Sequence, residues 1–175
     1  MSSSKRISLC WAVSLLLGTA LTLPAQNASF DEIPRSLRTQ LAAYLTQADF
    51  SYVTDDAVPV SGEGRLYVQD SCYVLDMGLM KISSDGIDRW TVDADAREVY
   101  VEKAVSIAGA VAGFTVEKFD GLSSGGVKAR LLAPDGRRIT LTVPKMKMTA
   151  KAEADFFRVN TAALPSDWII TDLRQ

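Results

Sequence analysis

The chain has 175 residues, with 19 basic and 21 acidic side chains and no histidine. Without histidine, Ser-His-Asp and Cys-His catalytic systems are excluded, and a zinc site would depend on the two cysteines. The charges nearly balance and no basic stretch is present, so nucleic acid and anionic membrane surfaces are expected to be poor partners. No glycine-rich phosphate or dinucleotide loop appears. We therefore expect a binding protein rather than an enzyme, without metal or cofactor.

The first 25 residues are typical of a cleavable secretion signal. Two basic residues precede an apolar run over residues 7–20, and the small residue Ala25 precedes a plausible cleavage position. The run is short for a membrane-spanning helix. Cleavage after Ala20 and retention of the segment as an N-terminal anchor are the alternatives.

Cleavage after residue 25 would leave one domain, over residues 26–175. The loss of Lys5 and Arg6 would change the net charge from −2 to −4. Cys72 would be the one remaining cysteine, so no internal disulfide is expected. A chain of about 150 residues is long enough to bury its own core.

The first predicted element is a helix over Pro34–Ala48. Its apolar residues recur at spacings of three and four and would form one face, namely Leu37, Leu41, Tyr44, Leu45 and Ala48. Asp31 is positioned to cap this helix, and Pro34 would lie in its first turn.

From Phe50 onward the hydrophobic period becomes two, which predicts β-strands. Tight turns are expected near Asp70-Ser71, at Asp85-Gly86 and at Pro134-Asp135-Gly136, and Asp-Gly is a strong hairpin signal. Turn signals recur every 8–12 residues or so. The fold class predicted from them is mainly β, with one antiparallel sheet long enough to curl or close.

The apolar segment Val105–Phe114 fits neither a helix nor a strand well, because it is rich in glycine and other small residues. It is either a buried connector or a lid over an apolar site. In the second case, the lid residues would be Ile107, Val111 and Phe114.

Four stretches together resemble the periplasmic outer-membrane lipoprotein carrier (LolA) family: "GEGRLYVQDSCYVLDM", "SSDGIDRWTVD", "ADFFRVN" and "LPSDWIITDLR". The resemblance runs in order from the Pro34 helix to Arg174. It implies an unclosed antiparallel β-barrel covered by short helices, with a late strand at the Phe-Phe pair. It also implies a periplasmic protein that carries acylated lipoproteins from an inner-membrane exporter to an outer-membrane acceptor. The chain has Asp70 where the family's carriers have an arginine that contacts the lid, and its lid segment is shorter.

Alternation along the predicted strands suggests which side chains line an acyl-binding cavity. Trp90 is the first candidate, because Arg89 and Thr91 would face the other way. The flexible methionines suit a surface that must repack. The full set of cavity candidates is Leu66, Val68, Val74, Met80, Ile82, Trp90, Val92, Met146, Met148 and Phe157. Each of them is equally compatible with ordinary sheet core.

Three functions follow. The first is a monomeric periplasmic carrier for lipoproteins or another acylated lipid. The second is a module of the same fold that senses such a lipid and regulates a partner. The third is a structural β-domain with a filled core. A cavity separates the first two from the third, and transfer to an acceptor separates the first from the second.

Overall fold

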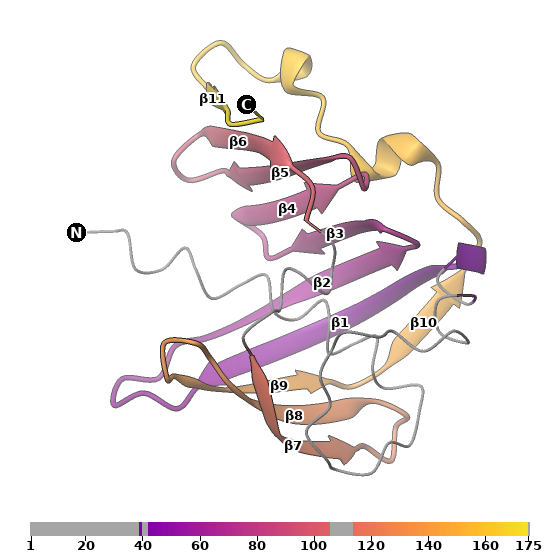
Figure 1. Cartoon of the computed structure of the whole chain (residues 1–175), viewed down its shortest axis with the longest axis vertical. Helices are drawn as coiled ribbons and strands as arrows, with labels where there is room; N and C mark the ends of the chain where they lie inside the picture. Colours follow the sequence, from indigo (N-terminus) through magenta and orange to yellow (C-terminus); the bar gives the residue numbers. More distant parts are fainter. Residues whose placement is uncertain (1–38, 40–41, 106–113, 175) are drawn as a thin grey trace.

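The computed structural model describes residues 39, 42–105 and 114–174. Their strands form one curved, unclosed sheet of eleven strands, which confirms the predicted mainly-β class (Figure 1). None of the helices among these residues combines the length and apolar character needed to cross a lipid bilayer.

The strands follow one another closely along the chain and are joined mostly by tight turns. They are β1 (Leu45–Thr54), β2 (Ser61–Gln69), β3 (Cys72–Asp76), β4 (Met80–Ser84), β5 (Asp88–Asp93), β6 (Glu98–Lys103), β7 (Thr115–Gly121), β8 (Val127–Leu132), β9 (Arg138–Val143), β10 (Met146–Thr149) and β11 (Ile169–Asp172). Two short 3-10 helices, η3 (Ala154–Phe157) and η4 (Thr161–Ala163), lie between β10 and β11.

Across the sheet the order is β11-β6-β5-β4-β3-β2-β1-β9-β8-β7. The long strands β1 and β2 cross the middle of the molecule in Figure 1, with β3–β6 on one side and β7–β9 on the other. β10 pairs with β1 next to β9, so β9 and β10 follow one another along the same edge of β1. Every pair is antiparallel except β11 with β6, because the chain crosses the sheet before it adds β11.

The predicted N-terminal helix over Pro34–Ala48 is wrong at its C-terminal end. Residues 45–48 belong to β1, where Ala48 lies between Leu66 of β2 and Met146 of β10. The pairing of both edges of β1 outweighs the helical spacing of its leucines. Of residues 34–44, only 39 and 42–44 are described.

The predicted turns at Asp85-Gly86 and Pro134-Asp135-Gly136 are both present, with Gly86 at φ 86° and Gly136 at φ 83°. Only glycine adopts such angles readily. In the first turn, the Asp85 carboxylate accepts hydrogen bonds of 2.9 Å from the amides of Ile87 and Asp88. These bonds fix the hairpin formed by β4 and β5.

After β10 the chain crosses one face of the sheet, and we call residues 150–168 the strap. The strap contains η3 and η4 and ends where β11 joins β6 (Figure 1). The Phe156-Phe157 pair was expected in a strand, and this expectation is wrong, because both residues lie in η3. In that helix, one ring is buried and the other is exposed.

Candidate functional site

The strand register sorts the side chains of the sheet onto two faces. Paired residues lie on the same face, and each two-residue step along a strand returns to it. One face carries the largest core cluster, which we call the apolar face. It consists of Ala48, Phe50, Leu66, Val68, Tyr73, Leu75, Ile82, Val127, Ala129, Leu131, Ile139, Leu141 and Val143.

The apolar face extends over six strands, from Ile82 in β4 to Leu131 in β8. Its residues are at most 5% exposed. Among the described residues, the side chains that pack against it are Tyr52, Met77, Phe114, Val116 and Met146, and none comes from η3 or η4. The face is therefore wide, continuous and free of charged side chains.

Two glycines of β2 leave room for aromatic rings of β1 on this face. A Cβ built on Gly64 would lie 2.7 Å from Phe50 Cζ, and one built on Gly62 would lie 2.7 Å from Tyr52 Cε1. Both rings lie over the backbone of their cross-strand partner. Ring-over-glycine pairs are a known way of shielding a strand that lacks side chains. Here they bring the two rings close to the backbone of β2 where β1 and β2 meet.

The strap occupies part of the opposite face. Phe157 is 1% exposed and packs with Leu45 of β1 and Val74 of β3. Farther along the strap, Leu164 and Trp168 pack against a cluster that contains Trp90. Two smaller cores thus lie beneath the strap, and the one around Phe157 lies back to back with the apolar face at β1 and β3.

Hydrogen bonds with defined geometry fix the strap to the sheet. The Gln69 side chain accepts a bond of 2.8 Å from the backbone amide of Ala152 and donates one of 3.1 Å to its carbonyl. Ser83, which is fully buried, donates a bond of 2.6 Å from its hydroxyl to the carbonyl of Phe157. The bond from Ser83 is buried and the two to Gln69 are partly buried, and together they attach the chain to the sheet before and within η3.

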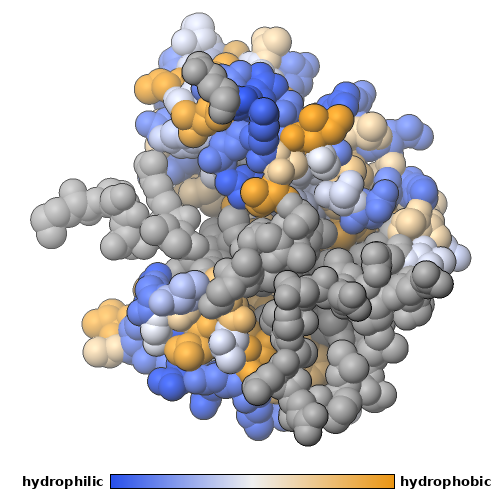
Figure 2. Space-filling view, in the orientation of Figure 1, coloured by the Kyte–Doolittle hydropathy of each residue, from blue (hydrophilic) through white to orange (hydrophobic). Residues whose placement is uncertain are grey.

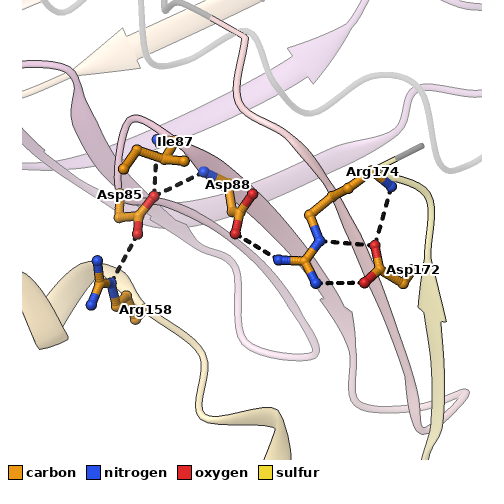
Figure 3. A network of polar contacts seen from close by, with 6 residues as sticks. All are labelled: Asp85, Ile87, Asp88, Arg158, Asp172 and Arg174. Atoms are coloured by element: carbon orange, nitrogen blue, oxygen red, sulfur yellow. Dashed lines mark hydrogen bonds and ion pairs between the residues drawn. The ribbon is translucent and has the colours of Figure 1, made fainter.

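Charged contacts continue this attachment to the end of the chain (Figure 3). Arg158 Nε donates to Asp85 Oδ2 at 2.8 Å, and Arg174 Nη1 donates to Asp88 Oδ2 at 2.8 Å. Burial of Asp85 opposes its ionisation, but hydrogen bonds from Asp88, Ile87 and Arg158 outweigh burial and lower its pKa. Arg174 also holds the pKa of Asp172 at about 2. The network is a structural attachment of both strap and tail to the β4-β5 turn.

The structure brings some of the predicted cavity residues together on the apolar side. Leu66, Val68 and Ile82 belong to the apolar face, and Met146 packs against it. Met80 and Met148 lie on the same side of the sheet by register. Met80 is partly exposed opposite Asp93, and Met148 is 49% exposed opposite Thr46.

The expectation that the other candidates share this face is wrong. Val74, Trp90, Val92 and Phe157 lie on the opposite face, beneath or within the strap. The turn after β2 has two residues, so Val68 pairs with Tyr73 and not with an even-numbered residue. The same change of parity recurs between β3 and β4 and between β4 and β5. Trp90 therefore faces away from Ile82, although both positions are even.

The predicted lid falls largely on residues that the structure leaves undescribed. Ile107 and Val111 lie outside the described residues, and Phe114 is half-buried against the apolar face. Asp70, which stands where the resemblance implies an arginine, occupies the turn between β2 and β3 with φ 54°. Aspartate tolerates this left-handed conformation better than most residues do, so the turn itself accounts for it.

The remaining polar features of the described residues include a half-buried cysteine and an open depression. No group of three or more His, Cys, Asp and Glu side chains that could hold a metal ion occurs among these residues. Cys72 is half-buried beside the Phe157 cluster, and burial raises the pKa of its thiol. An open depression of about 420 Å³ lies over β1, β2 and β9; its lining consists of Ser51, Tyr52, Val53, Ser61, Gly62, Glu63, Thr140 and Thr142.

Exposed hydrophobic side chains are dispersed over the surface. In Figure 2 they form separate patches among hydrophilic residues on both halves of the visible face. The most exposed are Val58 (81%), Ile87 (71%) and Leu79 (65%), each in or beside a turn between strands. The largest continuous apolar surface of the described residues is thus the buried apolar face.

Sequence reasoning missed two parts of this arrangement. The strap was not foreseen, although the apolar residues Phe157, Leu164 and Trp168 at irregular spacing after the last hairpin are its signal. The second missed part is the packing of aromatic rings of β1 over glycines of β2. Its signal in the sequence is the two glycines of "SGEGR", which pair with Tyr52 and Phe50. Comparison with protein-family models and with curated proteins gives no match for the chain.

Proposed function

We propose that the chain binds acyl chains on its apolar face and acts as a carrier for acylated lipoproteins or related lipids. The observation that supports this proposal is the continuous apolar face of an unclosed sheet, with buried side chains from β1–β4, β8 and β9. An open curved sheet allows a long flexible ligand to enter along its length, whereas a closed small barrel is filled by its own side chains.

The physical chemistry of acyl chains requires no more than such a surface. Burial of each methylene yields about 0.8 kcal/mol, so a chain of about 14 carbons gains on the order of 10 kcal/mol. Polar recognition is unnecessary at that magnitude. The proposal therefore agrees with a site that has neither charged groups nor metal ligands among its described residues.

The resemblance of the sequence motifs to the lipoprotein carrier family supports the same function. Export by the N-terminal segment and transfer between two membranes belong to the proposal. The alternative is a sensor of the same fold that binds the lipid without transferring it. Asp70 favours this alternative, because it stands where the family's carriers have the arginine that contacts the lid.

Native mass spectrometry tests the binding directly. The mature protein is delipidated and incubated with a synthetic triacylated lipopeptide. A complex of one lipopeptide per chain is expected, and its absence would refute acyl binding. Transfer of the bound lipopeptide to acceptor vesicles over time would then separate a carrier from a sensor.

A matched pair of substitutions tests which face holds the ligand. Met77→Gln changes a half-buried residue that packs against the apolar face, and Val92→Thr changes a half-buried residue on the opposite face. Both substitutions are near-isosteric and introduce a polar group. Met77→Gln is expected to weaken lipopeptide binding about tenfold, which corresponds to 1.4 kcal/mol, and Val92→Thr to leave it unchanged. Equal effects of the two variants would refute the assignment of the face.

Tryptophan fluorescence gives an independent measurement. Trp90 and Trp168 share one cluster on the opposite face, and quenching by a brominated acyl chain requires near contact with the indole. We expect little quenching of these residues and strong quenching of a Phe114→Trp reporter in a Trp90→Phe/Trp168→Phe background. The opposite pattern would place the ligand beneath the strap.

A further inference from the structure

The charges of the described chain are strongly segregated, although its net charge is small. Residues 127–151, which form β8–β10 and their turns, contain seven basic side chains and one acidic side chain, a net charge of +6. The other described residues contain eight basic and 18 acidic side chains, a net charge of −10. The molecule is therefore dipolar along its sheet.

Five of the seven basic side chains are exposed and have no ion-pair partner among the described residues. Arg137 pairs with Asp135, and Arg138 pairs with Glu117. The five remaining cations are Lys128, Arg130, Lys145, Lys147 and Lys151. We call these five residues the basic patch.

The register places part of the basic patch on the face opposite to the apolar face. Lys128 pairs with Thr142 and Arg130 with Thr140, while Lys147 pairs with Gln47 of β1. Along a strand, alternate residues on one face are about 7 Å apart. The two clusters beneath the strap contain no residue of β8 or β9. This part of the sheet surface therefore remains open to solvent.

Protection of a sheet edge explains only some of these cations. Lysines on an edge strand discourage pairing with other chains, and this accounts for Lys145 and Lys147 beside and within β10. Lys128 and Arg130, however, lie on β8, which pairs with β7 on one side and β9 on the other. An interior strand has no edge to protect, so the two residues call for a different explanation.

We propose that the basic patch docks the protein onto the surface of a bilayer that contains anionic phospholipids. The cations are spread over a sheet surface and do not converge on a pocket, which suits a plane of separate headgroups better than a single small anion. The acidic remainder orients the molecule by repulsion, with β8–β10 toward the membrane.

This inference rests on the charge distribution and does not depend on lipid binding by the apolar face. It replaces the expectation drawn from net charge alone, which treated the two oppositely charged parts of the chain as one sum. Basic residues near an anionic surface contribute about fivefold each to binding. Five cations are thus sufficient for measurable but reversible docking at low salt.

The test is vesicle flotation with delipidated protein and no acyl ligand, so its result is independent of carriage. Vesicles of phosphatidylcholine alone are compared with vesicles that also contain the anionic lipid phosphatidylglycerol. Binding to the anionic vesicles only is expected, with loss of binding at about 0.5 M salt because of screening. Equal binding to both vesicle types, or to neither, would overturn the proposal.

A matched pair of double variants locates the surface. Lys128→Gln/Lys147→Gln removes two lysines of the basic patch, and Lys81→Gln/Lys103→Gln removes two from β4 and β6 with the same change of net charge. The first is expected to weaken vesicle binding about 25-fold, and the second to have little effect. Equal losses of vesicle binding in the two double variants would show that net charge alone governs binding. Tighter binding to double-stranded DNA than to anionic vesicles would point to a nucleic acid partner. Either result would overturn the proposal.

Discussion

Replacement of Phe157 by alanine tests whether the strap is a true second layer of the fold. Phe157 is 1% exposed and packs with Leu45 and Val74, which both lie far before it in the sequence. Its ring also meets Phe156 edge to face, with centroids 5.1 Å apart. Removal of a buried phenylalanine side chain costs about 3–5 kcal/mol, because apolar contact is lost and a cavity remains.

The loss is large relative to the free energy of unfolding of a domain of this size, which is about 5–15 kcal/mol. For a domain of about 150 residues, a loss of this magnitude lowers Tm by roughly 6–20 °C. Urea unfolding followed by the fluorescence of Trp90 and Trp168 measures the effect, since Trp168 belongs to the strap and packs against the cluster that contains Trp90.

Phe156→Ala is the control, because this neighbour is 42% exposed and contacts Tyr67 at the surface. Its loss is expected to cost about 1 kcal/mol, the magnitude of an aromatic pair. If the two variants unfold at the same urea concentration, the strap does not contribute the buried layer described above. A Phe157→Leu variant that recovers more than half of the stability would confirm that packing, and not the backbone at η3, is responsible.

Three further outcomes follow from the structure. The pKa of Asp85 is lowered in the fold, so its ionised form stabilises the fold above the pKa of the unfolded chain, and this contribution is lost as the pH falls through the folded pKa. Asp85→Asn should therefore flatten the decline of stability between about pH 5 and pH 2. An unchanged decline would exclude Asp85 as its source. Gly64→Ala would place a Cβ 2.6 Å from the carbonyl of Asp76 and should lower the free energy of unfolding by about 1–3 kcal/mol. Gly121→Ala is the control, because no atom lies within 4 Å of its Cβ, and it should be near neutral in the same denaturation assay. Comparable losses would contradict the close packing at Gly64. Burial raises the pKa of the Cys72 thiol, so iodoacetamide should react with this thiol more slowly in the folded protein than in the urea-unfolded chain. The reaction should be faster in Phe157→Ala than in the unsubstituted protein. Equal rates in the folded and unfolded chain would show that the thiol is freely accessible.

Hairpins and strand positions were accessible from the sequence because their signals are local. The Asp85-Gly86 and Pro134-Asp135-Gly136 turns need backbone angles that only a few residue types adopt, so the sequence records them directly. Alternation of apolar and polar residues then indicates strands between these turns. The mainly-β class follows from the same two signals.

The assignment of residues to faces required information that alternation within one strand does not carry. A turn of two residues pairs even with odd positions, as at Val68 and Tyr73. Whether even or odd positions face the apolar side must therefore be worked out again after every turn. The predicted cavity set places Trp90 and Ile82 on one face, and this is the wrong side for Trp90. A pairing rule applied hairpin by hairpin would have separated Trp90 from Ile82.

The start of β1 and the position of the strap depend on contacts over long sequence distances. Ala48 is held in a strand by Leu66 and by Met146, almost a hundred residues later. Gln69 and Ala152 are likewise 83 residues apart. Local propensity contains no trace of such partners, and the helical spacing of residues 37–48 was therefore misleading at its end.

The strap also has a consequence for the order in which the chain acquires its structure during synthesis. Residues 152–168 complete two of the three hydrophobic clusters, and β11 covers the outer edge of β6. A nascent chain emerges from its N-terminus, so Leu45, Val74 and Trp90 stay uncovered until residues 152–168 have been made. Release of the polypeptide before the strap is made would leave a sheet with apolar side chains exposed on one side. Such a species is a substrate for chaperones and proteases. The second side of the sheet is thus completed only after residue 168 has been synthesised.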